Sequence, residues 1–293
     1  MRPDCTRRRS RSGTWIAFVT ILGAAAAFRL ALVALLRNKQ THDVQVFVSW
    51  AQLLTRYGNH GLYHHVDTID HYSVNYPPLF IIVLDVVDAV YLRLVPHGGE
   101  NVVLLGMLLK IPAIVADLAI CCIVFVVIRR WSGSAAALVA VAIAAFAPST
   151  WPISAVWGQV DSICTSFLMA ALALTFERKY TLVWSALALA ILVKPLPIVL
   201  APLLLMVQFR DRRWSWGLIA GPGCAIVIAY VVSLPFAPTV SLAGVLSWLA
   251  GSYASGQSLT DATSVNAYNV WTLWWLVTPD SRLLLGLRLH AWG

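Results

Sequence analysis

The chain alternates between long apolar stretches and short polar connections, and most of its charge lies in those connections. The first apolar run extends from Trp15 to Leu36, about 22 residues, which is enough to cross the ~30 Å hydrocarbon core of a bilayer. Arginines crowd the sequence before this run, so we expect residues 1–14 to form a basic cytoplasmic tail. No small-residue cleavage site follows the run, and we interpret it as a retained first span.

One apolar run decides the topology of everything after it. Leu79–Val95 is about 17 residues long, but it contains Asp85 and Asp88, each of which would cost about 2.5–3.5 kcal/mol near mid-bilayer. If this run spanned, the later basic clusters would all face outward, against the tendency of basic loops to stay inside. If residues 77–95 instead lie along the interface, the two aspartates share a helical face that can point to water. We adopt this interfacial helix, which leaves residues 37–101 as one extracytoplasmic loop.

With that choice, the pattern predicts an all-α, polytopic transmembrane bundle of about eight spans, with juxtamembrane helices in the long first outer loop. We interpret the whole chain, 1–293, as a single transmembrane domain without internal repeats. The expected spans are Trp15–Leu36, Asn101–Ile128, Ser134–Pro148, Val160–Phe176, Thr181–Val193, Leu196–Phe209, Trp216–Pro235 and Val265–Val277.

Composition supports the membrane interpretation. Hydrophobic residues make up 59% and charged residues 12%, against roughly 45–50% and about 25% in ordinary domains. This excludes a soluble globular enzyme, a disordered chain and a disulfide-stapled secreted domain. The net charge of +8 would suggest a nucleic-acid partner in a soluble protein, but here the basic residues flank apolar runs and set topology, so we expect none. The cysteines show no CxxC or Cys/His spacing, and we expect buried hydrophobes.

Asp43 lies just after the first span, at the start of the long outer loop. A carboxylate at a membrane boundary can have its pKa tuned by partial desolvation, which makes Asp43 a candidate general base. The alternative is an ordinary helix N-cap.

Two ionisable residues, Lys110 and Asp117, lie inside the second expected span, seven positions apart on one helical face. Ionisable residues inside a span usually face a cavity or a partner. Lys110 is nearer the outer side, where it could meet a lipid phosphate. The alternative is a Lys–Asp pair that stabilises the bundle.

Two further connections carry polar groups on the outer side. Trp157, Gln159 and Asp161 open a span, where Asp161 would occupy a first helical turn that favours a carboxylate, either as a site residue or as a cap. Lys194 precedes Pro195 between two short spans, where it could bind phosphate or form a simple turn.

Aromatic and amide side chains suited to sugars or headgroups lie at two other places. Tyr76 precedes a diproline that begins the interfacial helix, and Asn266, Tyr268 and Asn269 lie at the entrance of the last expected span, where they equally suit an aromatic belt.

The first outer loop also collects histidines beside aspartates: His60, His64, His65 and His71 with Asp67 and Asp70. Adjacent histidines do not share a helix face, and no HExxH pair occurs, so we expect neither a metal nor another cofactor.

The order of these motifs resembles the GT-C superfamily of integral-membrane glycosyltransferases. The similarity runs from Asp43 through Gly61-Leu62-Tyr63, Tyr76-Pro77-Pro78-Leu79, Lys110 with Asp117, Trp157-Gly158-Gln159 with Asp161 and Lys194-Pro195 to Asn266-Ala267-Tyr268-Asn269. The most similar branch contains the dolichyl-phosphate-glucose-dependent glucosyltransferases and their prokaryotic polyprenyl-phosphate-sugar relatives.

The resemblance implies a multi-pass enzyme of a prokaryotic cell membrane. It would transfer mannose or glucose from a polyprenyl-phosphate donor to a glycan, lipid or protein acceptor on the extracytoplasmic face, with inversion. It makes Asp43 the catalytic base and puts Gln159 and Asp161 in the active site. The alternative function is a non-catalytic or transport membrane protein that handles lipid-linked sugars.

The chain departs from the family pattern in two places. Residues 251–257 lack the basic residue expected for the donor phosphate, which shifts that role to Lys110 or Lys194. The sequence ends at Gly293, before the further spans that relatives usually carry, so a C-terminal truncation is one interpretation.

Overall fold

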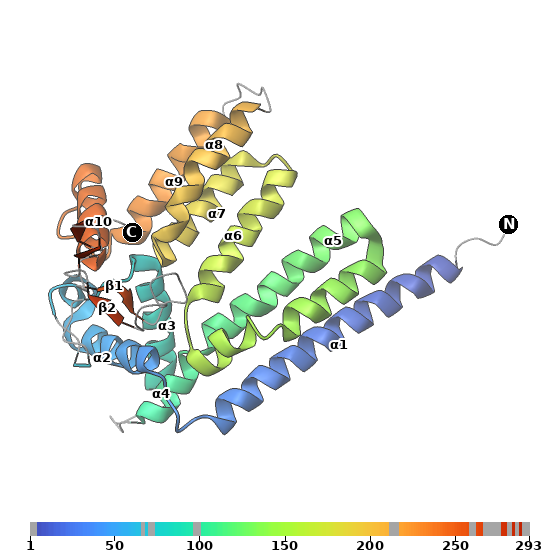
Figure 1. Cartoon of the computed structure of the whole chain (residues 1–293), viewed down its shortest axis with the longest axis horizontal. Helices are drawn as coiled ribbons and strands as arrows, with labels where there is room; N and C mark the ends of the chain where they lie inside the picture. Colours follow the sequence, from blue (N-terminus) through green and yellow to red (C-terminus); the bar gives the residue numbers. More distant parts are fainter. Residues whose placement is uncertain are drawn as a thin grey trace.

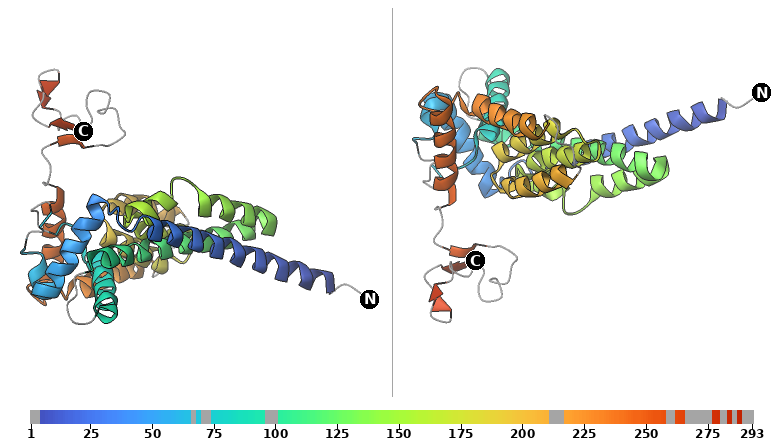
Figure 2. Two further views of the ribbon diagram at one scale, coloured as in Figure 1. Left: turned by 90° about the horizontal axis from the view of Figure 1, so that it is seen from below. Right: turned by 90° about the horizontal axis from the view of Figure 1, so that it is seen from above.

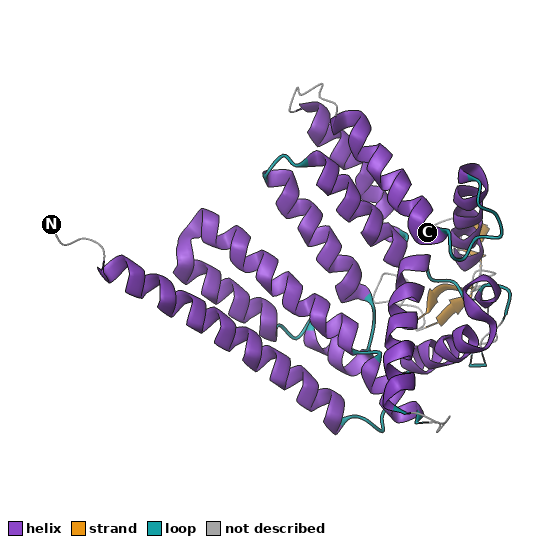
Figure 3. Ribbon diagram, turned by 180° about the vertical axis from the view of Figure 1, so that it is seen from behind, coloured by secondary structure: helices purple, strands orange, loops and turns teal. Residues whose placement is uncertain are grey.

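The computed structural model describes residues 5–65, 68–69, 74–95, 101–210, 217–257, 262–265, 277–279, 283–284 and 287–288. Helices make up almost all of this described part, which agrees with the expected all-α class (Figures 1 and 3). They are α1 (Cys5–Leu35), α2 (His42–Leu62), α3 (Pro78–Leu94), α4 (Val102–Leu108), α5 (Ile111–Phe146), the π-helix η1 (Pro152–Trp157), α6 (Asp161–Phe176), α7 (Tyr180–Val193), the 3-10 helix η2 (Leu196–Leu200), α8 (Ala201–Arg210), α9 (Gly217–Ser233) and α10 (Leu242–Gln257).

Near the C-terminus the described residues form two short hairpins, β1 (Ala262–Val265) with β2 (Val277–Pro279), and β3 (Leu283–Leu284) with β4 (Leu287–Arg288). The prediction of a span over Val265–Val277 is therefore wrong, because these two residues pair with each other across the first hairpin. A helix of that length would separate its ends by about 18 Å. The segment is too short for an easy crossing, and it is rich in the β-branched and aromatic residues that favour strands.

Helix α5 consists of two antiparallel arms joined at Gly133. This glycine has φ 81° and ψ 178°, a conformation that other residues rarely adopt, and Figure 1 shows the chain reversing there. Phe125 of the first arm packs in one buried cluster with Ala137 and Val141 of the second. The reversal falls between Ile128 and Ser134, where the sequence pattern expects it.

The long helices form a bundle in which each segment runs in the opposite direction to the segment before it in the sequence (Figure 1). α1 packs on α5, α5 on α6, α6 on α7 and α7 on α9 (Figure 1). One end of the bundle is basic. Arg130, just before the reversal in α5, and Lys179, between α6 and α7, both form ion pairs with Glu177. Arg129 lies over the ring of Trp15. Basic residues from distant parts of the sequence therefore gather at the same end.

Helices α2, α3 and α10 gather at the opposite end and lie across the direction of the long helices (Figures 1 and 2). Phe47 and Trp50 of α2 pack on Phe80 of α3 and on Tyr76, which precedes it. This aromatic cluster belongs to the largest buried apolar core in the described residues, so this end of the bundle is itself well packed.

The sides of the bundle are apolar. Two helical segments, Ser12–Leu35 and Val102–Phe146, are long and apolar enough to cross a membrane. Large apolar side chains point outward from every long helix: Val19, Leu30, Val115, Val139, Ile143, Leu172, Leu182, Leu203, Met206, Ile219 and Val227 are each at least 46% exposed, as are others on the same helices. Soluble monomers rarely expose a contiguous apolar surface of this extent, so the surface is consistent with a membrane-embedded bundle.

The structure corrects the expectation that Asp85 and Asp88 share a water-facing surface. Asp85 is exposed, but Asp88 is only 6% exposed and accepts a hydrogen bond of 2.5 Å from Thr55 Oγ1 on α2. Positions i and i+3 differ by about 60° around a helix, and here that difference moves Asp88 to the buried edge of α3.

Burial raises the pKa of Asp88, with the charge of Asp85 adding to it, although the Thr55 hydrogen bond acts in the opposite direction. The folded state therefore holds this proton more tightly than the unfolded chain, and stability falls as the pH rises from the unfolded pKa through the folded one. We expect Asp88→Asn to raise the unfolding temperature by about 1–3 °C at pH 7 and to leave it unchanged near pH 4. Thermal unfolding in detergent measures this. Asp85→Asn removes only the repulsion from a neighbouring exposed carboxylate, so it should give a smaller rise than Asp88→Asn; an equal rise in both variants would contradict the assignment.

Candidate functional site

Asp43, on the first turn of α2, accepts two side-chain hydrogen bonds on a single oxygen. Trp157 Nε1 and Gln159 Nε2 both donate to Oδ2, the second at 2.6 Å. No donor among the described residues reaches Oδ1, and the side chain is half-buried. These bonds run to another part of the chain rather than to the α2 backbone, so Asp43 is not an N-cap. Asp43 is a carboxylate whose Oδ2 is fixed by two donors and whose Oδ1 has no donor among the described residues.

The loop that holds Asp43 requires the backbone of Gly158 to lie very close to α2 and to Lys110. Gly158 has φ 80°, and a Cβ there would lie 2.6 Å from Val44 Cγ2 and 3.2 Å from Lys110 Cγ. Only glycine fits both the conformation and the space. Thr41 Oγ1 donates to the Trp157 carbonyl at 2.6 Å and fastens the loop to the start of α2.

Lys110 packs against this loop and bonds to the backbone just before it. Its side chain is buried, and Nζ donates to the Val156 carbonyl at 2.9 Å. It makes no ion pair within the described chain, so the alternative of a Lys110–Asp117 pair is wrong. Lys110 is therefore a residue that positions Trp157 and Gln159, and its ammonium is turned away from solvent.

Asp117 lies outside the site. Its Oδ2 accepts from Arg29 Nε at 3.0 Å and from Ser154 Oγ at 2.6 Å, and Arg29 Nη1 donates to the Ala145 carbonyl at 2.9 Å. Arg29 and Asp117 are both buried, so Asp117, a candidate substrate-binding residue, takes the bundle-stabilising role of the alternative, with Arg29 in place of Lys110 as its partner. Arg29 was not predicted from the sequence, although a charged residue inside an expected span is itself the signal for a buried partner.

A second cluster joins Asp161, Lys194 and Tyr76. Asp161, on the first turn of α6, forms an ion pair with Lys194, which follows α7 in extended backbone. Lys194 Nζ also lies 5.6 Å from the centre of the Tyr76 ring. The Tyr63 hydroxyl donates to the Tyr76 carbonyl at 2.8 Å and holds the segment before the diproline in place.

The charged groups of both clusters act on the pKa of Tyr76. Burial raises the pKa of Tyr76, and the carboxylates of Asp161 and Asp43 raise it further, whereas Lys194 lowers it. Burial by itself lowers the pKa of Lys194, but Tyr76 and Asp161 outweigh that effect and raise it. At neutral pH the site therefore presents a neutral phenol and a protonated ammonium between two carboxylates.

Two buried polar atoms beside these clusters have no partner among the described residues. They are Oε1 of Gln159, whose amide nitrogen binds Asp43, and Nε1 of Trp50, whose ring packs on Tyr76. Buried acceptors and donors usually find a partner. The described residues thus leave one acceptor and one donor unsatisfied beside the site.

The remaining predictions divide by what the structure describes. Asn266, Tyr268 and Asn269 lie outside the described residues, as do Asp67, Asp70 and His71. Within the described ranges, no three His, Cys, Asp or Glu side chains are grouped as a metal site would require. Of the candidate residues, Asp43, Trp157, Gln159, Asp161, Lys194 and Tyr76 come together, Lys110 lies directly behind them, and Asp117 is separate.

Comparison of the chain with protein families, with characterised proteins and with solved structures finds no match. The chemistry of the site therefore has to be argued from its own residues.

The Arg29–Asp117 pair predicts a coupled loss of stability. Arg29→Met leaves a buried carboxylate unpaired, and Asp117→Leu leaves a buried guanidinium unpaired, so each should destabilise the protein by about 3–5 kcal/mol. The double variant removes both charges and should recover most of that loss. Thermal unfolding of the four proteins in detergent gives the coupling, with Arg93→Met, an exposed arginine, as control. Additive losses in the double variant would show that the two residues do not act as a pair.

Proposed function

We propose that the protein is a GT-C-type membrane glycosyltransferase that moves mannose or glucose from a polyprenyl-phosphate donor to an acceptor hydroxyl on the extracytoplasmic face. The observation that carries the proposal is the convergence of Asp43, Gln159 and Lys194 at one end of the bundle, although Asp43 is 116 residues from Gln159 in the sequence and further still from Lys194. A scaffold would have no need to bring these groups together. No second function is favoured by a specific contact.

The proposed topology follows from the charges at the two ends. Seven crossings, by α1, the two arms of α5, α6, α7, η2 with α8, and α9, would put the basic turns inside and the Asp43 end outside. Several of these helices are short, and 14 residues of α7 cover about 21 Å, which a locally thinned bilayer accommodates. The protein would then be a multi-pass protein of a prokaryotic cell membrane.

Asp43 supplies the base in this proposal. Trp157 and Gln159 hold Oδ2, so Oδ1 is the oxygen that can take the proton of an acceptor hydroxyl. The acceptor oxygen bonds to the anomeric carbon as the bond from that carbon to the phosphate oxygen breaks. The polyprenyl phosphate leaves as an anion that needs no general acid, and a single displacement inverts the anomeric configuration.

Lys194 is the cation we assign to the donor phosphate. Lys110 is buried against a backbone carbonyl, whereas the Lys194 side chain is 26% exposed and protonated. A fixed ammonium stabilises the negative charge that develops on a leaving phosphate. Asp161 holds that ammonium in position until the donor binds.

An apolar cavity along the second half of α7, the helix that precedes Lys194, suits the donor's hydrocarbon chain. It measures about 230 Å³, lies between α7, η2, α9 and α10, and is walled by Ile191, Leu192 and Ile198, which flank Lys194 in the sequence. We propose that the first isoprene units lie here, because the phosphate they carry would then reach Lys194.

Asp43→Asn tests the base directly. An asparagine oxygen can still accept from Trp157 and Gln159, so we expect normal folding, but the amide cannot take a proton and transfer should fall by about 10²–10⁴-fold. The measurement is sugar transfer in proteoliposomes with polyprenyl-phosphate mannose and glucose. Asp85→Asn, an exposed carboxylate on α3, is the control and should keep full activity.

Near-wild-type turnover of Asp43→Asn would rule out Asp43 as the base. Binding of the donor by the wild-type chain with no transfer to any acceptor would instead support the alternative, a non-catalytic or transport protein for lipid-linked sugars.

A further inference from the structure

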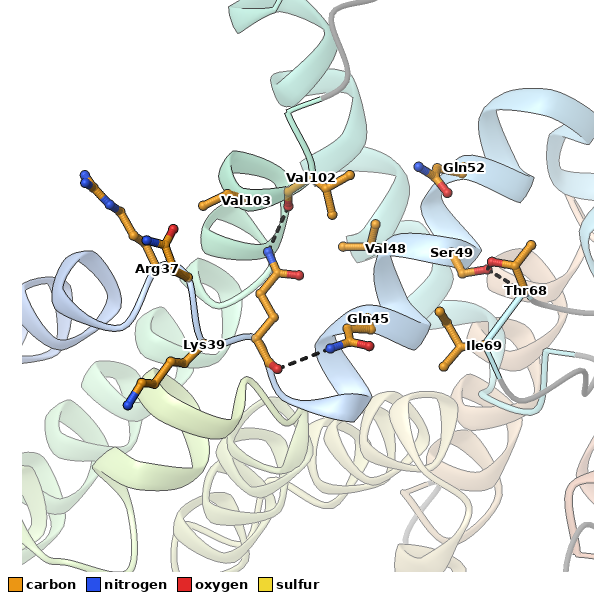
Figure 4. A pocket seen from close by; sticks show the side chains of 12 residues that line it. Arg37, Lys39, Gln45, Val48, Ser49, Gln52, Thr68, Ile69, Val102 and Val103 are labelled. Atoms are coloured by element: carbon orange, nitrogen blue, oxygen red, sulfur yellow. Dashed lines mark hydrogen bonds between the residues drawn. The ribbon is translucent and has the colours of Figure 1, made fainter.

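A polar pocket lies on the side of α2 that faces away from Asp43. It has a volume of about 510 Å³ and is bounded by the α1–α2 connection, α2, the start of α4 and the Thr68–Ile69 segment (Figure 4). Ligand sites commonly measure about 300–1,000 Å³, so the pocket is large enough for a small headgroup. None of the groups assigned to transfer lines it.

The periodicity of α2 explains why one helix carries two separate sites. Asp43, Phe47 and Trp50 recur at i, i+4 and i+7 and face the aromatic core. Gln45, Ser49 and Gln52 recur with the same spacing, two positions later, and therefore occupy the opposite face. The face that carries Phe47 and Trp50 already anchors α2 in the core, so the polar residues of the opposite face are not needed to pack the helix.

The walls of the pocket are held by bonds of their own. Gln40 Nε2 donates to the Val102 carbonyl at 2.9 Å and ties the α1–α2 connection to α4. Gly106 makes room for that side chain, because a Cβ there would lie 2.3 Å from Gln40 Nε2. On the other side, the Thr68 backbone N–H donates to Ser49 Oγ at 3.0 Å. The pocket is therefore formed before any ligand binds.

The chemistry of the pocket divides into two sides. Arg37 and Lys39 lie at one side with their charged ends directed outward, and Ser49, Gln52 and Thr68 lie at the other (Figure 4). Neither cation forms an ion pair with any described residue, so each charge can turn toward a ligand at this rim. Guanidinium and ammonium groups favour phosphate, and amides with a threonine hydroxyl favour hydroxyl groups.

The pocket also lies where apolar surface changes to polar surface. Arg37 comes two residues after the end of α1, and Leu35 at that end is 80% exposed. Val102, on the pocket rim, is 39% exposed. A ligand with a charged, hydroxylated head and a hydrocarbon chain would find both kinds of surface within reach.

We propose that this pocket binds a phosphorylated polyol, with its phosphate at Arg37 and Lys39 and its hydroxyls against Gln45, Gln52 and Thr68. The ligand is recognised by charge at one side and by hydrogen bonding at the other, so a phosphate without a polyol is a poor substitute. The site is independent of the transfer chemistry, and its test needs no activity.

The experiment titrates the full chain in detergent with short-chain lipids: phosphatidylglycerol, phosphatidic acid (phosphate without a polyol) and phosphatidylcholine. Phosphatidylglycerol should bind at least about tenfold more tightly than either of the others, since two or more hydrogen bonds distinguish it. Soluble glycerol 3-phosphate is titrated in parallel. Equal affinity for it would show that the headgroup alone is recognised, and weaker affinity would identify a membrane lipid as the source; both results agree with the proposal.

Variants separate the two sides of the pocket. Arg37→Gln with Lys39→Gln should weaken phosphatidylglycerol binding by at least about tenfold. Gln45→Leu with Gln52→Leu should reduce it to the level of phosphatidic acid. Arg93→Gln removes an exposed cation outside the pocket and should change nothing. Equal affinity of the wild type for all three lipids would overturn the proposal, as would unchanged binding in both double variants.

Discussion

The buried contact of Arg29 with Asp117 is the interaction on which the rest of the structure depends. Two charges cannot stay in an apolar bundle without each other, so α1 must meet the first arm of α5 at this point. Arg29 also reaches the end of the second arm, and Asp117 accepts from Ser154 in η1. One ionic contact therefore fixes four segments. Trp157 ends η1 and Gln159 lies in the loop that follows it, and so the position of Asp43 depends on a pair of residues that take no part in its chemistry.

The second constraint is the difference between the two ends of the bundle. The turns at one end carry arginine and lysine around Glu177, and the other end carries the Asp43 and Asp161 carboxylates beside Lys194 and a cluster of aromatic rings. In our proposal, the membrane lies between them. A cytoplasmic basic end and an outer polar end agree with a donor whose phosphate and sugar stay at the membrane surface while its hydrocarbon chain remains in the bilayer.

Sequence periodicity predicted the parts of the molecule in which local pattern and packing agree. The helical class, the reversal between Ile128 and Ser134 and the gathering of Asp43, Gln159, Asp161 and Lys194 all follow from apolar runs and the polar groups that interrupt them. The failures have physical causes. Val265–Val277 was short and rich in strand-forming residues, Asp88 was buried by the neighbouring α2, and the partner of Asp117 came from a helix 88 positions away in sequence. Tertiary partners of this kind leave no local signal, although Arg29 inside an apolar run pointed to one.

Labelling with a membrane-impermeant thiol reagent on intact cells tests the central claim most directly. Single cysteines at Asn38, Arg93 and Arg178, in a chain whose five natural cysteines are replaced, report the α1–α2 connection, the end of α3 and the α6–α7 turn. We predict that positions 38 and 93 react from outside and that position 178 reacts only after the membrane is opened. Reaction of positions 38 and 178 from outside, with position 93 protected until the membrane is opened, would mean that α3 crosses the membrane and would contradict the proposed arrangement.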